Sequence, residues 1–262
     1  MSTLHQPDFT IEELETFNSD GFVRLGQVVP DGDIGDLCQR IDDIMLGKIA
    51  YEKMLMQLCP SAGKPALAVQ SKQFKEPSLK YRKIQDLEQD PLFRSYIQNP
   101  LFCDITRKII GDRIAVFRSM FFNKPAEQGI TIDWHQDGAG GWGITIPPKI
   151  TIWTALDRTR IENGCLQIIP GTHKDIIPQQ GDLLSPEEIQ RYAPESKRIY
   201  LEMEPGEVVL LHNWTLHKSE TNHTDAPRRA FSVCYIDSAT KRRSDGLGFP
   251  QVFPAYASVE QG

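Results

Sequence analysis

The sequence predicts a mainly β protein with helices at its N-terminal end, and two observations indicate this fold class. In the first third of the 262 residues, apolar side chains recur at helical spacing. From Arg113 onward, short runs rich in β-branched and aromatic residues are separated by Gly, Pro and Asp, which is typical of a β-sandwich or barrel. We therefore expect a single domain with a helical part over about 1–112, a β core over about 113–237 and a C-terminal tail or lid over 238–262.

The helical part carries start and stop signals. Thr10 and Glu13 have the spacing of a capping box ahead of an apolar helix face, and Gly21 stands where that helix would end. The elements expected here are a helix between Thr10 and Gly21, a short strand at 22–25, helices at 31–45 and 91–110, and a loop or weak strand at 61–76. We expect these helices to pack on one sheet of the β part.

The strands expected in the β part lie at 114–122, 149–155, 165–169, 207–212 and 230–236. The run from Val208 to Leu211 does not alternate between apolar and polar residues. Such a run indicates a strand that is covered on both faces.

Composition argues against several classes of function. The formal net charge of −6 disfavours non-specific nucleic-acid binding, which needs clustered Lys and Arg. No apolar run approaches the roughly 18 residues of a membrane span, and the polar residues 1–10 carry no evident secretory signal. The five cysteines are odd in number and lack a C-x-x-C spacing, so we expect reduced thiols in a cytoplasmic protein rather than disulfides or a zinc site.

The triplet His135-Gln136-Asp137 is the most informative motif. In an extended segment, residues i and i+2 point to the same face, so the imidazole and the carboxylate can converge on one ion. His217, which follows the apolar strand 207–212, is a candidate third ligand, and two histidines with one carboxylate form the facial triad of non-haem Fe(II) oxygenases. The alternatives are a turn-capping pair on the surface and, for the third ligand, the nearby His212.

A second group of residues concerns a 2-oxo-acid cosubstrate, whose far carboxylate needs a bidentate cation. Arg228 and Arg229 begin the strand at 230–236, which we expect to pair beside the His217 segment. Because neighbouring strand residues face opposite sides, at most one of these arginines reaches the pocket. The alternative is a solvated strand edge.

Beyond these residues, the chain resembles the phytanoyl-CoA dioxygenase family of Fe(II)/2-oxoglutarate oxygenases. The matching stretches, in the family's order, are Phe17–Leu25, Arg118–Pro125, Trp134–Asp137, Thr151–Leu156, Glu162–Lys174, Pro205–His212 and Leu216–Ser219. Among them the element N-G-C-L-x-x-x-P-G-T-H at 163–173 is quite specific. The resemblance implies a double-stranded β-helix core, that is, a cupin-like jelly roll with N-terminal helices.

Carried over residue by residue, the resemblance implies roles for eight positions. The implied iron ligands are His135, Asp137 and His217. The implied contacts to 2-oxoglutarate are Arg228, Trp153, Met120, Ser219 and Lys83. Arg229 has no such role, and His212 becomes a core residue or a neighbour of the ligands. Trp153 and Met120 are equally compatible with plain core packing, and His173 is expected to be a hydrogen-bonded structural residue.

The resemblance further implies a dioxygenase that uses Fe(II), 2-oxoglutarate and O₂ to hydroxylate, or otherwise oxidise, an unactivated C–H bond of a small molecule. The carboxylate of Asp137 argues against halogenation, because related halogenases have a small residue there. Two alternatives are a catalytically silent jelly-roll module that binds a ligand, and a cupin-type metal enzyme that uses no 2-oxoglutarate.

Substrate recognition is expected at three segments. These are the Trp-bearing loop 139–143, the run 246–254 as a possible lid, and the basic cluster 241–243, which a coenzyme A thioester would need near the mouth of the site. A free small molecule or a natural-product intermediate is an equally open expectation.

Overall fold

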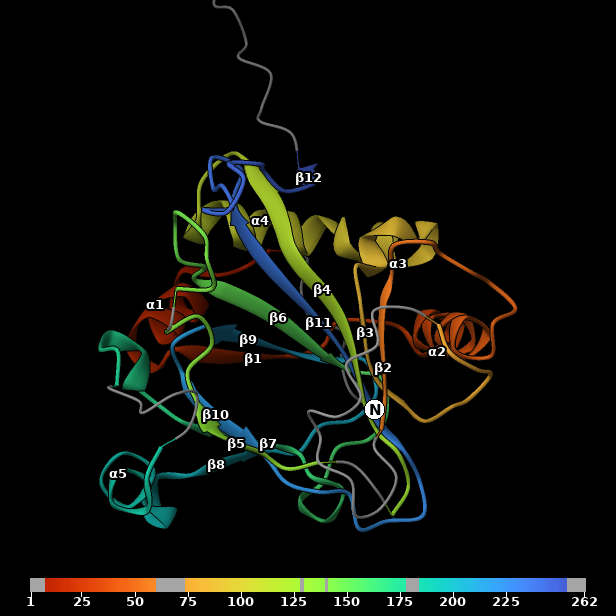
Figure 1. Ribbon diagram of the computed structural model, residues 1–262. Coiled ribbons are helices and arrows are strands. Elements are labelled where there is room, and N and C mark those ends of the chain that lie inside the picture. Colours follow the sequence, from red (N-terminus) through yellow and green to blue (C-terminus); the bar gives the residue numbers. More distant parts are fainter. Residues whose placement is uncertain (1–7, 60–73, 128–129, 140, 178–183, 254–262) are drawn as a thin grey trace, which may run out of the picture.

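The computed structural model describes residues 8–59, 74–127, 130–139, 141–177 and 184–253. Two antiparallel sheets face each other, and α1 to α4 lie against the larger one (Figure 1). The described helices are α1 (Ile11–Asp20), α2 (Asp31–Met45), α3 (Pro91–Ile97), α4 (Pro100–Ile109) and α5 (Pro186–Tyr192). The described strands are β1 (Phe22–Gln27), β2 (Leu55–Leu58), β3 (Tyr81–Gln85), β4 (Ile114–Lys124), β5 (Ile132–His135), β6 (Ile150–Ala155), β7 (Leu166–Ile169), β8 (Ile199–Leu201), β9 (Glu207–His212), β10 (Leu216–Ser219), β11 (Arg228–Asp237) and β12 (Gln251–Phe253).

The strand order is that of a jelly roll. The large sheet has the order β1-β9-β6-β11-β4-β3-β2, with β12 also paired to β4, and the small sheet has the order β5-β10-β7-β8. From β4 to β11 the chain passes repeatedly between the two sheets, so that β4, β6, β9 and β11 face β5, β7, β8 and β10. The predicted jelly-roll core is confirmed.

The two faces of the large sheet explain why the run in β9 does not alternate. Val208 and Leu210 point outward into the core shared with the helices. Val209 and Leu211 point inward, toward the small sheet, and pack with Trp153. Both faces are therefore covered, as predicted, and the helices do pack on one sheet.

The first helix follows its sequence signals. The Thr10 side chain accepts a hydrogen bond from the Glu13 backbone N–H, and the capping box is complete. Gly21 ends α1 at φ +77°, a left-handed conformation, and an added Cβ there would lie 2.4 Å from both the His173 ring and the Thr215 hydroxyl. Glycine is thus required for the close approach of α1 to the end of the small sheet.

The third expected helix is wrong in one respect, because 91–110 forms two helices rather than one. α3 ends before Asn99, whose side chain caps α4 by accepting from the Leu101 backbone N–H. Pro100 is the first residue of α4, and a residue that precedes proline is disfavoured in helical conformation. The chain therefore turns at Asn99 and starts a new helix.

The part expected to be helical also contributes strands to the large sheet. The strand expected at 22–25 is present as β1, and β2 and β3 extend the opposite edge of the sheet beyond β4. The interval 60–73, which includes most of the expected loop or weak strand, lies outside the described residues.

The C-terminal segment is built into the fold as far as residue 253. β12 pairs with β4, and Arg242 forms a bridge to Ile144. The run 246–253 is thus held against the large sheet, while 254–262 lie outside the described residues. No helix in the described ranges combines the length and apolar character that crossing a bilayer requires.

Candidate active site

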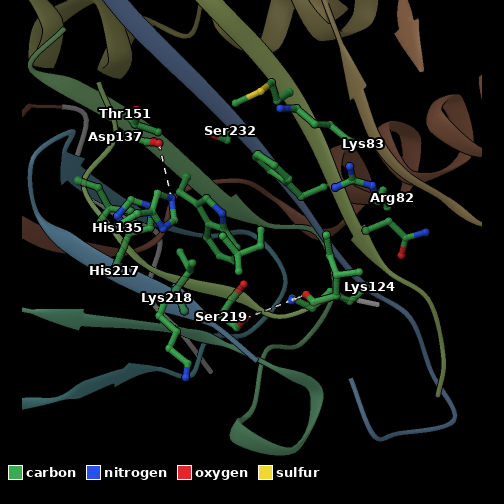
Figure 2. A pocket seen from close by; sticks show the side chains of 18 of the residues that line it. Arg82, Lys83, Lys124, His135, Asp137, Thr151, His217, Lys218, Ser219 and Ser232 are labelled. Atoms are coloured by element: carbon green, nitrogen blue, oxygen red, sulfur yellow. Dashed lines mark hydrogen bonds and ion pairs between the residues drawn. The ribbon is translucent and has the colours of Figure 1, made fainter. Parts of the chain in front are cut away.

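A cavity of about 360 Å³ lies between the two sheets. Its floor is the inner face of the large sheet, where Arg118, Met120, Phe122 and Lys124 occupy every second position of β4. Figure 2 shows His135, Asp137 and His217 together at one side, with the labelled Lys83, Arg82 and Lys124 across the cavity.

The three predicted metal ligands converge. His135 and His217 are register partners on the neighbouring strands β5 and β10, and Asp137 lies in the turn directly after β5. One potential ligand atom from each of the three residues lies within 4.8 Å of those of the others. Nε2 of His135 is 3.7 Å from a carboxylate oxygen of Asp137 (Figure 2). Two imidazoles and one carboxylate in this arrangement are typical of a ferrous site with open positions.

Backbone carbonyls orient both imidazoles. Nδ1 of His135 is 2.7 Å from the Asp133 carbonyl, and Nδ1 of His217 is 2.8 Å from the Thr215 carbonyl. When Nδ1–H donates to a carbonyl, Nε2 is left free as the coordinating atom. Burial and the neighbouring His135 lower the pKa of His217 to about 4, so its ring is neutral, the form that binds a metal.

Gln136, the middle residue of the triplet, fixes the turn that carries the ligands. Its amide nitrogen lies within 3.1 Å of the carbonyls of Thr172, Asp175 and Trp214, and its amide oxygen accepts from the Ile177 backbone N–H. The side chain points away from the ligand face and ties the turn to the loops at the end of the small sheet.

The two neighbouring arginines separate as expected. Arg228 is 3% exposed and lines the cavity, whereas Arg229 points to the outer face and forms ion pairs with Asp157 and Asp42. The expected strand pairing is wrong, because β11 pairs with β4 and β6 in the large sheet and not with β10. Arg228 therefore faces the small sheet across the cavity.

The Arg228 guanidinium is held from one side only. It donates to the Gly164 carbonyl at 2.9 Å, while its buried Nε has no hydrogen-bond partner among the described residues. Burial lowers its pKa to about 10, so it keeps its charge at physiological pH. A buried cation with an unsatisfied donor fits a ligand carboxylate.

Gly164 places this carbonyl. Its φ is +77°, and an added Cβ would lie 2.2 Å from the Glu220 carbonyl oxygen. The Asn163-Gly164 turn therefore approaches the end of β10 more closely than any other residue type allows. That approach sets the position from which the loop supports Arg228.

The other predicted cosubstrate residues also line the cavity. The ring centroid of Trp153 lies 5.9 Å from the guanidinium carbon of Arg228. Met120 lines the cavity from the large sheet, and Ser219 lines it from the small sheet. The Ser219 hydroxyl forms no hydrogen bond with the described residues. Lys83 on β3 reaches the cavity as well, and burial, together with Arg118 and Arg82, lowers its pKa to about 8.

Four lining cations, Lys124, Arg118, Arg82 and Lys218, have no predicted role. Lys124 is 5% exposed and donates to the Ile130 carbonyl at 2.6 Å, and burial and Arg228 lower its pKa to about 7. Arg118 and Arg82 also face the cavity. The period-two array 118-120-122-124 in β4 is the sequence signal that identifies Arg118 and Lys124, because it places them on the face of Met120.

His212 and His173 lie near the ligands but have other roles. His212 ends β9 and His217 lies in β10, so they belong to different sheets rather than to one strand. His212 lines the cavity but is not one of the converging ligands, and its Nδ1 accepts from the Trp214 backbone N–H. His173 contacts the Asn18 carbonyl at 3.1 Å and packs at Gly21, which is the structural role expected of it.

These residues fit a ferrous ion and a keto acid. The two free Nε2 atoms and the Asp137 carboxylate provide three ligands on one side of the cavity. The orphaned Nε of Arg228 and the hydroxyl of Ser219 provide donors for a carboxylate on the other. Donors of both kinds therefore line one cavity between the sheets.

Comparisons with known proteins agree with this arrangement. The family model described as phytanoyl-CoA dioxygenase matches residues 17–230. A probable phytanoyl-CoA dioxygenase of Caenorhabditis elegans is 28% identical over 86% of this chain and 75% of its own length. The peroxisomal phytanoyl-CoA dioxygenase of Homo sapiens is 26% identical over 95% of this chain and 74% of its own length.

Solved structures share the fold. The crystal structure of EctD from S. alaskensis in its apoform has a TM-score of 0.75 and 20% identity, and it covers 97% of this chain and 86% of that one. The same protein has been solved with 2-oxoglutarate and 5-hydroxyectoine, with a TM-score of 0.72, 18% identity, and coverage of 90% of this chain and 79% of that one.

Proposed function

Because the chain belongs to the phytanoyl-CoA dioxygenase family and is a non-haem iron, 2-oxoglutarate-dependent dioxygenase, we propose that it oxidises an unactivated C–H bond of a small organic molecule. The observation that carries the proposal is the convergence of His135, Asp137 and His217 opposite the guanidinium of Arg228, whose Nε has no hydrogen-bond partner among the described residues. Hydroxylation is the leading reaction. Desaturation or ring formation would use the same ligands.

Each residue has a distinct role in this proposal. His135, Asp137 and His217 hold Fe(II), and the carbonyls of Asp133 and Thr215 keep the two Nε2 atoms aimed at it. Iron, O₂ and 2-oxoglutarate together supply the oxidising power that breaks the C–H bond, and 2-oxoglutarate leaves as succinate and CO₂.

The cosubstrate side is formed by five residues in this proposal. Arg228 binds the far carboxylate of 2-oxoglutarate, and the Ser219 hydroxyl donates to the same group. Trp153 and Met120 form the apolar wall beside its carbon chain and exclude water from it. Lys83 adds positive charge from β3, where its register partner on β4 is Phe122.

The orphaned Arg228 also separates this proposal from a cupin-type enzyme that uses no 2-oxoglutarate. Such an enzyme has no use for a buried, unpaired guanidinium, which is costly to maintain without an anion. A silent ligand-binding module, for its part, has no use for three metal-ligating side chains that converge on one point. A cytoplasmic location stays a prediction from composition.

The test uses the weak visible charge-transfer band of an Fe(II)·2-oxoglutarate chelate. We expect the band when both are added to the protein without oxygen, and its absence in His135→Ala and Asp137→Ala. Under air, the wild type should convert 2-oxoglutarate to succinate even without its substrate. A band that persists in both variants would contradict the ligand assignment, and a wild type without band or succinate would contradict the function.

A further inference from the structure

We propose that the substrate is an organic anion whose carboxylate or phosphate group binds Arg118, at the junction between the cavity and a second basin. This inference rests on the proposed function and names the substrate class of that same site. It starts from the charges of the cavity, where Asp137 is the only carboxylate among the described lining residues. The lining cations are Arg82, Lys83, Arg118, Lys124, Lys218 and Arg228.

Three of these cations are already accounted for. Lys218 pairs with Glu220 at 2.7 Å, Lys124 donates to backbone carbonyls, and Arg228 faces the cosubstrate. The other three, Arg82, Lys83 and Arg118 on β3 and β4, form no ion pair or hydrogen bond with the described residues, and only Lys83 among them is assigned to the cosubstrate. One doubly charged cosubstrate does not balance this surplus, so the geometry calls for a second anion.

Arg118 is the best-placed of the three. Its guanidinium carbon lies 4.6 Å from the Phe117 ring centroid and 4.2 Å from that of Trp142. Contact with two aromatic faces holds a guanidinium in place and leaves its N–H edge free for an anion. Arg118 and Asp137 line the same cavity, so an anion bound to Arg118 lies in the cavity that contains the proposed metal ligands.

Arg118 joins the cavity to an open basin of about 590 Å³ and lines both. The basin combines the rings of Phe117, Trp142 and Phe249 with Arg242 and Arg243, and none of its described lining residues is acidic. Nε of Arg243 donates to the Ile144 carbonyl, and Arg242 pairs with Asp245 outside the basin lining. Cationic and aromatic walls suit the remainder of an anionic substrate whose reacting carbon lies in the inner cavity.

The test measures small probes on the protein loaded with Fe(II) and saturating 2-oxoglutarate under argon. Calorimetric titration compares phenylacetate and phenyl phosphate with the neutral phenylacetamide. We expect at least one anion to bind 10-fold or more tightly than the amide, and the stronger of the two distinguishes a carboxylate from a phosphate substrate. In Arg118→Gln the preference should vanish, and in Arg118→Lys part of it should remain.

Arg158→Gln is the matched control. Arg158 is an exposed arginine that pairs with Glu204 and lines neither cavity, so its loss should leave the preference unchanged. Equal binding of acid and amide by the wild type, absence of anion binding, or an undiminished preference in Arg118→Gln would each overturn the inference.

The chelate band, recorded in the same samples, separates this inference from the proposed function. A wild type that forms the band but shows no anion preference refutes the substrate class and leaves the function standing. A wild type without the band refutes the function. If Arg118→Gln raises the half-saturating 2-oxoglutarate concentration as much as the probe Kd, Arg118 serves the cosubstrate and the inference is overturned.

Discussion

At one end of the cavity, Arg228 and Lys124 donate to backbone carbonyls, whereas Arg82, Lys83 and Arg118 form no hydrogen bond or ion pair with the described residues. The first end is held before any ligand binds, because the carbonyls of Gly164 and Ile130 already accept from its cations. The second is formed by long side chains of β3 and β4, inside the large sheet, and Arg118 there contacts Trp142. The difference indicates that the first end serves the cosubstrate, and that Arg82 and Arg118 at the second end, beyond the Lys83 assigned to the cosubstrate, serve a substrate particular to this protein.

The largest effect should come from the proposed metal ligands. His217→Ala is expected to lower turnover by more than about 100-fold, since even partners that only orient a ligand contribute roughly 10–100-fold. Iron content after anaerobic loading and succinate formation measure it. His212→Ala is the control, and a variant at position 212 that loses iron as completely as the one at 217 would contradict the assignment.

The next largest effects are expected at the neighbouring residues Arg228 and Arg229. Arg228→Gln should raise the half-saturating concentration of 2-oxoglutarate about 30-fold or more, because losing a buried charge partner costs about 2 kcal/mol or more. Arg229→Gln should leave that concentration unchanged and lower the free energy of unfolding by about 1–3 kcal/mol, because it breaks the pairs with Asp157 and Asp42. Titration of the chelate band measures the cosubstrate affinity, and urea unfolding measures the stability. A lower cosubstrate affinity in Arg229→Gln with an unchanged affinity in Arg228→Gln would contradict the assignment of Arg228.

The turn that supports Arg228 gives a smaller effect. Gly164→Ala places a Cβ against the Glu220 carbonyl and should raise the half-saturating 2-oxoglutarate concentration about 3–10-fold, with a stability loss of about 2 kcal/mol. Gly171→Ala has a similar φ of +76° but meets nothing within 4 Å, so it should lose about 1 kcal/mol and keep its cosubstrate affinity. Equal cosubstrate affinities in the two variants would show that the turn does not position Arg228.

The smallest effect is a pH dependence at the cosubstrate end. The pKa of Lys124 is about 7 in the fold and near its ordinary value of 10.5 when unfolded, so the unfolded chain binds more protons between these values. The free energy of unfolding of the metal-free protein should therefore rise from pH 7 to 8.5, by up to about 1.4 kcal/mol per pH unit. Urea unfolding should show a flatter slope for Lys124→Met, and an unchanged slope would contradict the lowered pKa.

Sequence was sufficient where chemistry and spacing are local. Arg228 and Arg229 lie on adjacent positions of one strand, so their separation follows from strand geometry. His135 and Asp137 are only two residues apart, so their convergence is local as well, although Asp137 lies in the turn after β5 and not in the strand. The capping box at Thr10 and the doubly covered β9 are predictable for the same reason. His217 needed the family's spacing, because nothing local relates it to the triplet.

The missed features have physical reasons. β5 and β10 are four residues long and β8 three, too short to show a period. β3 reads Tyr81-Arg-Lys-Ile-Gln85, and its cations face a polar cavity instead of an apolar core, which hides it as a strand. Arg118 takes its role from Trp142 and from a second basin, and both are tertiary relations.

The register of His135 against His217 has a mechanical consequence. β5 is an outermost strand of the small sheet and pairs only with β10, so an ion held by residues of both strands cross-links the rim of the sheet to its interior. The metal then helps to hold β5 against β10, because an ion that binds only the native state lowers the population of states in which β5 has detached. Backbone amides of β5 should exchange with deuterium first when iron is withdrawn, ahead of those in β6 and β11.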